Sequence, residues 1–271
     1  MRKLLPLALF CLLFCLLTTA GFGSATLVQS NAGGSVTGSV LSLGTLTTSA
    51  GGFSGSTGTG HLIVFVGYIV CHGAAPGSIS DFAPAIGGGY GTSFAGGPGA
   101  YWESGTDGGL VSVRHISNAP SMSPSQTITW QVRNNNSGTA TMQAEFVLYE
   151  FGNIPSSPVL DLGSSGVYAD SQPIGTPAIS FSATANTDLI VVAHSSINTG
   201  ANILAGSGYT LGIDATTAVI GQTEYNLDAS PGQTSAAFNG SENTWGIAAM
   251  AFSVLGSSPS SAVPRHPGFV N

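Results

Sequence analysis

Apolar residues in this chain recur in short runs separated by clusters of Gly, Ser, Asn and Pro, and this spacing strongly constrains the fold. After residue 25, no stretch carries the i, i+3, i+4, i+7 spacing of an amphipathic helix. Residues 127–132 alternate instead, with Ile128, Trp130 and Val132 on one side and polar residues between them. Such alternation is typical of a half-buried strand. The sequence therefore predicts an all-β protein.

The predicted strands are too numerous for a small β domain. This many strands in one domain indicates a single two-sheet antiparallel β-sandwich. A jelly roll fits the number of strands best, with a concanavalin-like or immunoglobulin-like sandwich as alternatives. The strands are predicted near residues 26–29, 35–47, 61–70, 77–82, 110–117, 126–132, 139–151, 177–182, 187–194, 209–213, 218–226, 233–238 and 245–254.

Three of these runs, 62–70, 189–193 and 245–254, are apolar on both faces. A strand that buries both faces lies inside a sheet that is covered on each side. We therefore expect these to be central strands, with the second face covered by long loops or by a neighbouring subunit.

The N-terminus has the layout of a secretory signal peptide. Arg2 and Lys3 precede an apolar run over 4–17, and small and polar residues follow. Small residues permit cleavage after Ala20 or after Ala25, and we favour Ala25 because a strand then opens the mature chain. The predicted organisation is a signal peptide at 1–25, a β-sandwich domain at 26–254 and a disordered Ser/Pro-rich tail at 255–271. The expected location is extracellular, without membrane attachment after cleavage.

Charge is scarce, and this scarcity excludes several functions. Lys, Arg, Asp and Glu together make up 6% of the chain, where an ordinary soluble domain has about 25%. The chain after residue 25 keeps three Arg and twelve acids, a net charge of −9. Nucleic-acid binding and polybasic attachment to lipid both require clustered Lys and Arg, so neither is expected.

The most biased segment is 87–109, in which ten of 23 residues are Gly and aromatic residues are interleaved. We interpret it as a loop and a candidate ligand-binding site, because flat rings can stack on sugar faces and a carboxylate can accept hydroxyl hydrogen bonds. The alternative is that Tyr101 and Trp102 pack inward and anchor the loop. The candidate ligand-binding residues are Tyr90, Tyr101, Trp102 and Glu103.

The sequence gives little support for catalysis or for a metal or cofactor site. Glu145 and Glu150 share a predicted strand but point to opposite faces, so they cannot form a glycosidase pair. If its face is the core, Glu150 needs a partner such as Arg114 or Arg133. Glu224 and Glu242 could still converge in space with another acid, which leaves a secreted glycoside hydrolase as an alternative. The histidines lack metal-ligand spacing, no cofactor motif occurs, and a Ca²⁺ site built from Asp161, Asp170 or Asp107 stays open.

Cys71 is the one cysteine outside the predicted leader, and it ends an apolar run. An intrachain disulfide is therefore not expected, and a buried thiol is favoured over a reactive nucleophile.

Several short segments follow one another in a recognisable order. The segments are HLIVFV (61–66), SISD (78–81), TITW (127–130), VLYEF (147–151), NTDLIVV (186–192), GSGYT (206–210), EY (224–225) and WGIAAMAF (245–252). Their order resembles a broad group of bacterial secreted β-sandwich domains with a jelly-roll-like pattern. The resemblance covers roughly residues 27–254 and implies no established activity and no catalytic motif. The long Gly-rich segment at 87–109 and the 255–271 tail depart from the pattern.

Taken together, these features predict a secreted, non-enzymatic module that binds glycan or another cell-surface ligand. A self-assembling structural subunit of a surface layer, fibre or matrix is the main alternative. Two-faced apolar strands, the scarcity of charge and the absence of solubilising Lys after the predicted signal peptide favour that alternative.

Overall fold

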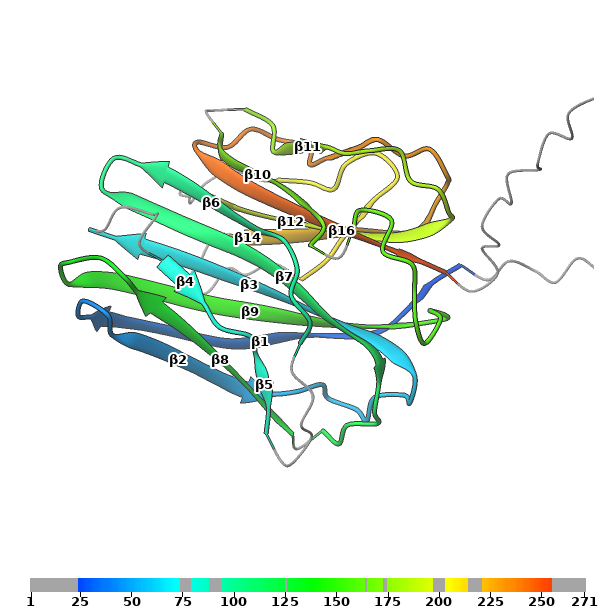
Figure 1. The fold of residues 1–271 in the computed structure, drawn as a ribbon, viewed down its shortest axis with the longest axis horizontal. Coiled ribbons are helices and arrows are strands. Elements are labelled where there is room, and N and C mark those ends of the chain that lie inside the picture. Colours follow the sequence, from blue (N-terminus) through cyan, green and yellow to red (C-terminus); the bar gives the residue numbers. More distant parts are fainter. Residues whose placement is uncertain are drawn as a thin grey trace, which may run out of the picture.

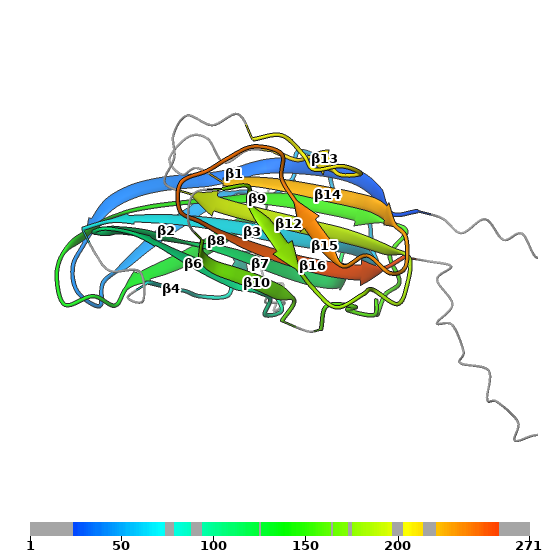
Figure 2. The ribbon, with the colours of Figure 1, turned by 90° about the horizontal axis from the view of Figure 1, so that it is seen from above.

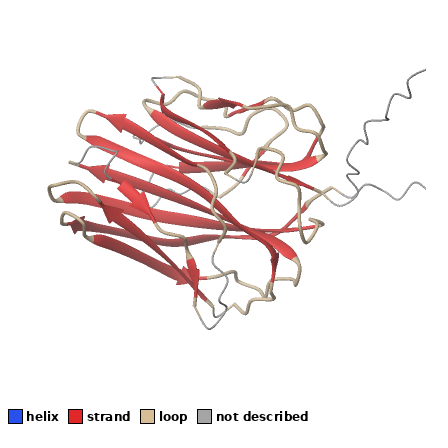
Figure 3. Cartoon of the chain, in the orientation of Figure 1, coloured by secondary structure: helices blue, strands red, loops and turns tan. Residues whose placement is uncertain are grey.

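The computed structural model describes residues 24–73, 79–87, 94–124, 126–163, 165–172, 175–196, 203–213 and 221–254. Strands, turns and loops account for all of these residues, and no helix occurs among them (Figure 3). Every paired strand is antiparallel. The prediction of an all-β sandwich is confirmed, while the strand order does not establish a jelly roll.

Two five-stranded sheets form the centre of the molecule (Figure 1). The N-terminal five-stranded sheet has the order β1 (Thr26–Val40), β9 (Ala140–Gly152), β3 (His61–His72), β7 (Asp107–Ala119) and β6 (Gly99–Ser104). The C-terminal five-stranded sheet has the order β10 (Val167–Gln172), β16 (Trp245–Ser253), β12 (Asp188–Ser196), β14 (Gly221–Ala229) and β13 (Thr210–Leu211).

A small sheet accompanies each of these large ones. In the N-terminal half, β8 (Thr127–Asn134) pairs with β2 (Thr45–Gly51), β4 (Ile79–Asp81) and β5 (Ala85–Ile86). In the C-terminal half, β11 (Ala178–Ser180) pairs with β15 (Ser235–Ala237).

The two halves of the chain repeat one topology. Each large sheet places its half's first strand at one edge, the last strand next to it and the half's long apolar strand in the middle. The small sheets match too, because β2 pairs with β8 as β11 pairs with β15. Corresponding pairs of residues align as well, since Leu62 faces Phe151 in one half and Leu189 faces Phe252 in the other. The fold is therefore an internally repeated arrangement of sheets.

Three apolar cores hold the layers together. The central core lies between the two five-stranded sheets, which overlie each other in Figure 2. A second core lies between the N-terminal five-stranded sheet and its small sheet, with Phe65 in ring contact with both Trp130 and Phe146. The third joins the outer face of the C-terminal five-stranded sheet to Ile179 and Ala236 of β11 and β15.

These cores explain the strands that are apolar on both faces. In β3, Val64 and Val66 face the central core, while Ile63 and Phe65 face the second core. In β12, Val191 and Ile190 divide in the same way between the central and third cores. The second faces are thus covered by the chain's own small sheets and flanking segments. Burial of these strands therefore does not call for a neighbouring subunit.

Two regions differ from the sequence-based expectation. The predicted strand at 35–47 is broken, because the chain turns after Val40 and places Leu43 at a φ of 59° before β2 begins. The segment 87–109, predicted as a loop, contains β6 and the start of β7. Its glycines weaken the local strand signal, but pairing with β7 supplies the order.

The residues just before β1 already contact the folded domain. Ala25 is 2% exposed in the central core, and its N–H donates to the carbonyl of Leu227 at 3.1 Å. The Ser24 carbonyl accepts from Asn153 Nδ2 at 3.2 Å. Cleavage after Ala25, which the sequence favoured, would remove both contacts.

We therefore expect export to cleave after Ala20. N-terminal sequencing of the exported protein should then begin at Gly21. A mature chain that begins at Thr26 would contradict this prediction.

Candidate functional site

Trp102, predicted to bind ligand, lies inside the molecule. Its side chain is fully buried in the central core, and its Nε1 donates to Ser195 Oγ of β12 at 3.2 Å. The indole lies across Gly109, its neighbour on β7, where an added Cβ would come within 2.4 Å of the ring. Trp102 thus takes the inward-packing role that the sequence left as the alternative, and its ring is not open to a ligand in this structure.

The other candidates do not share its surroundings. Tyr101 points to the opposite face of β6 and packs, partly buried, against the second core. Glu103 is exposed on the same strand, and Tyr90 lies outside the described residues. The structure therefore separates Trp102 from Tyr101 and Glu103, so these residues do not form one aromatic surface.

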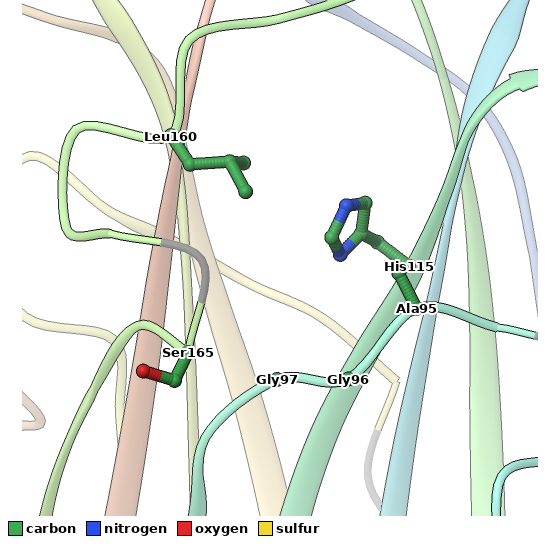
Figure 4. A pocket seen from close by; sticks show the side chains of 6 residues that line it. All are labelled: Ala95, Gly96, Gly97, His115, Leu160 and Ser165. Carbon is green, nitrogen blue, oxygen red and sulfur yellow. The ribbon is translucent and has the colours of Figure 1, made fainter.

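A pocket of about 440 Å³ opens beside β7, and Tyr101, Trp102 and Glu103 are not among its lining residues. Figure 4 shows the imidazole of His115 and the side chain of Leu160 facing each other across it. Leu160 lies between β9 and β10 and forms a bridge to Phe252 of β16. The pocket therefore lies where the two halves of the chain meet. Its lining residues are Ala95, Gly96, Gly97, His115, Leu160 and Ser165.

The Gly-rich segment supplies one wall of this pocket through its backbone. The Ala95 N–H donates to the carbonyl of His115 at 2.7 Å. A Cβ on Gly97 would lie 1.8 Å from the carbonyl oxygen of Val113 and 3.1 Å from Met250 Sδ. Only glycine allows the backbone to pass so close to β7. The composition bias of 87–109 thus serves close backbone approach at this position.

His115 is the titratable group of the pocket lining. It is 7% exposed, and its ring meets Phe252 edge-on at 5.2 Å between centroids. Burial lowers the pKa of His115, because the charged imidazolium loses solvation. The imidazole is therefore neutral at pH 7, and its Nδ1 has no hydrogen-bond partner among the described residues. In the sequence, His115 is one of several scattered histidines. No local pattern indicates that it lies next to Leu160 in the fold.

Glu145 and Glu150 behave as predicted from strand alternation. Their neighbours Val147 and Phe146 lie in different cores, so the two carboxylates are on opposite faces of β9. Glu150 is fully buried. Its partners are not arginines, because Arg114 pairs with Asp81 at 2.8 Å and the contacts of Glu150 are made by other residues.

Glu150 holds a compact network of its own. His61 Nδ1 lies 2.6 Å from its Oε1, the Gly58 N–H donates to the same oxygen at 2.7 Å, and Gln29 Nε2 donates to Oε2 at 2.6 Å. These contacts tie β1, β3 and the loop between β2 and β3 to β9. They give Glu150 a structural role.

Glu224 and Glu242 are both buried near the outer face of the C-terminal five-stranded sheet. Burial raises the pKa of Glu224 to about 7, although the Gly206 N–H, which donates to its Oε2 at 2.7 Å, opposes the shift. Glu242 accepts a hydrogen bond from Ser196 Oγ at 2.7 Å. A glycosidase needs two carboxylates that face substrate, and neither of these side chains is open to solvent.

Cys71 is buried as predicted. Desolvation, with a further contribution from Asp107, raises the pKa of its thiol to about 11. A protonated, buried thiol is a poor nucleophile. Among the described residues, no group of three His, Cys, Asp or Glu side chains is placed to hold a metal ion.

Comparison with known proteins identifies no relative: no family model, curated protein or solved structure matches the chain. Within the part of the chain that the structure describes, no helix has the length and apolar character needed to cross a membrane.

Proposed function

We propose that this chain is a secreted, non-enzymatic β-sandwich module that acts by binding, and that the pocket beside His115 is its ligand site. The observation that supports the proposal is a pocket of about 440 Å³ at the junction of the two halves. Small-molecule sites have volumes of roughly 300–1,000 Å³ and mostly apolar linings with a few placed polar groups.

The lining favours an uncharged ligand that has both an apolar face and hydroxyl groups. Its side chains carry no fixed charge, and the His115 imidazole is neutral at pH 7. Leu160 and Ala95 offer apolar contact, while Ser165 and the imidazole offer hydrogen-bonding groups. A sugar residue of a cell-surface glycan combines these properties. The proposed ligand class is the one expected from the sequence, but the proposed binding site is at a different position.

The test is affinity electrophoresis of the mature protein through gels that contain a panel of polysaccharides. We expect one polysaccharide to retard the protein, and His115→Phe to weaken retardation at least about tenfold. Phenylalanine preserves the ring packing against Phe252 but removes both nitrogens, and losing a polar contact at a binding site costs about 1.4 kcal/mol or more.

Glu103→Ala is the matched variant at the exposed position predicted from the sequence. Loss of retardation in Glu103→Ala but not in His115→Phe would move the site to β6. Absence of retardation by every polysaccharide, together with a large mass in light scattering, would favour the structural-subunit alternative.

A further inference from the structure

Two acidic residues, Asp161 and Asp188, interact next to the Leu160 wall of the pocket. Asp161 directly follows Leu160 of the pocket wall, and Asp188 is the first residue of β12. Asp161 accepts hydrogen bonds from the Ala185 N–H at 2.7 Å, the Asn186 N–H at 2.8 Å and Asn186 Nδ2 at 2.7 Å. These three N–H donors occupy both oxygens of the Asp161 carboxylate.

Asp188 has the opposite surroundings. Its side chain is fully buried, and neither carboxylate oxygen receives a hydrogen bond from the described residues. Its partners across the strands are Ala229 of β14 and Ser253 of β16, neither of which carries a charge. Asp161 is the charged group that acts on it within the described part of the chain. An ionised Asp188 would therefore be a buried charge beside a like charge.

The internal repeat makes this arrangement clearer. Leu62 and Leu189 occupy corresponding positions, so His61 and Asp188 each begin the long strand of their half. In the N-terminal half, His61 Nδ1 lies against the buried carboxylate of Glu150, and an imidazole N–H can donate a hydrogen bond to a carboxylate. In the C-terminal half, Asp188 has no such donor among the described residues, and the group that acts on it is a second acid, Asp161.

We propose that Asp188 is protonated at neutral pH and donates a hydrogen bond to Asp161, forming a pH-sensitive clamp that fixes the Leu160 wall of the pocket to β12. The protonated carboxyl group of Asp188 supplies an O–H donor, which an ionised carboxylate does not have. Asp161 also holds the turn at 185–186, so the clamp joins this turn, β12 and the segment that carries Leu160. The regulatory consequence for ligand binding rests on the proposed function, but the clamp itself does not.

The electrostatics set the direction of the pH effect. Burial, and then the charge of Asp161 and the hydrogen bond to it, raises the pKa of Asp188 from 3.8 to about 8. Because the folded-state pKa is raised, the stabilisation is complete below about pH 4 and declines as pH rises, until it is lost above about pH 8. Over this window the closed clamp holds one proton more than the open one, so opening should rise about tenfold per pH unit.

Hydrogen–deuterium exchange on the mature protein without ligand tests the clamp. We expect the opening equilibrium at 159–163 and 185–188, corrected for intrinsic exchange, to increase about 100-fold between pH 5 and pH 7. In Asp188→Asn the opening equilibrium should stay nearly constant, because the asparagine amide donates to Asp161 at every pH. Asp228→Asn is the matched control, since Asp228 is an exposed acid on β14, and it should follow the natural protein.

A parallel pH dependence in Asp188→Asn and the natural protein would overturn the proposal. So would protection by millimolar Ca²⁺ that disappears in Asp188→Asn, because a bound cation rather than a shared proton would then join the two carboxylates. Polysaccharide retardation is a separate measurement, so failure of the clamp and failure of the proposed binding function are distinguishable.

Discussion

Replacing Trp102 by alanine should lower the free energy of unfolding by about 3–5 kcal/mol, the usual cost of truncating a buried large aromatic side chain. The indole is fully buried between the two five-stranded sheets. Its removal leaves a cavity against Gly109, which has no side chain to fill the space. It also removes the hydrogen bond to Ser195, which joins the sheets. Denaturant unfolding followed by far-UV circular dichroism measures the change.

Two further variants separate the contribution of the buried indole ring from that of its Nε1 hydrogen bond and from that of the neighbouring Tyr101. Trp102→Phe keeps most of the buried ring but loses the Nε1 donor, so it should cost only about 1–3 kcal/mol. Tyr101→Ala, on the half-buried face of the same strand, should cost less than Trp102→Ala. If Trp102→Ala unfolds like the natural protein but loses ligand binding, the ring is exposed in solution and the binding role predicted from the sequence returns.

Replacing Glu150 by alanine should lower the free energy of unfolding by about 3–5 kcal/mol, because three partly buried donors lose their acceptor and each unsatisfied donor costs about 1–3 kcal/mol, toward the low end when partly solvated. The loss leaves the Gly58 N–H, Gln29 Nε2 and His61 Nδ1 without their shared acceptor. These groups belong to β1, β3 and the loop between β2 and β3, so we expect the loop over 53–60 to become susceptible to proteolysis. Chemical unfolding and limited proteolysis of the same sample measure both effects.

Glu150→Gln is the informative companion, because its amide oxygen still accepts one of the donors. Glu150→Gln should lower the free energy of unfolding by about 1–3 kcal/mol. Glu103→Ala serves as the control, since an exposed substitution away from such networks usually changes stability by less than about 0.5 kcal/mol. Equal stability of Glu150→Ala and Glu103→Ala would show that the network does not hold the loop.

The fold class follows from local pattern, and the layer arrangement does not. Alternation at Ile128, Trp130 and Val132 correctly predicts a strand with one buried face. The apolar character of both faces of β3 and β12 correctly places them inside covered sheets. Which segment covers each face depends on pairing between β2 and β8 and between β11 and β15. Such pairing is non-local and leaves little trace in short, polar strands.

The binding residues illustrate the same limit. An aromatic and glycine-rich segment can be read as a flexible loop, but Trp102 completes an interior and Gly97 allows close backbone approach. His115 and Leu160 belong to different halves and meet only because the sheets stack. The need of Glu150 for a partner is evident from its face of the strand. Yet its partner His61 lies 89 residues away along the chain and is brought to it by the pairing of β3 with β9.

Local sequence is enough to predict that the chain forms strands, that its long apolar strands are buried on both faces, and that Cys71 is a buried thiol. These properties depend on residues close together in the chain, whose periodicity and hydrophobicity act locally. The repeated sheet order, the inward position of Trp102, the pocket beside His115 and the meeting of Asp161 with Asp188 emerge only in the folded molecule. Each of these depends on the stacking of sheets built from distant segments, which no short stretch of sequence encodes.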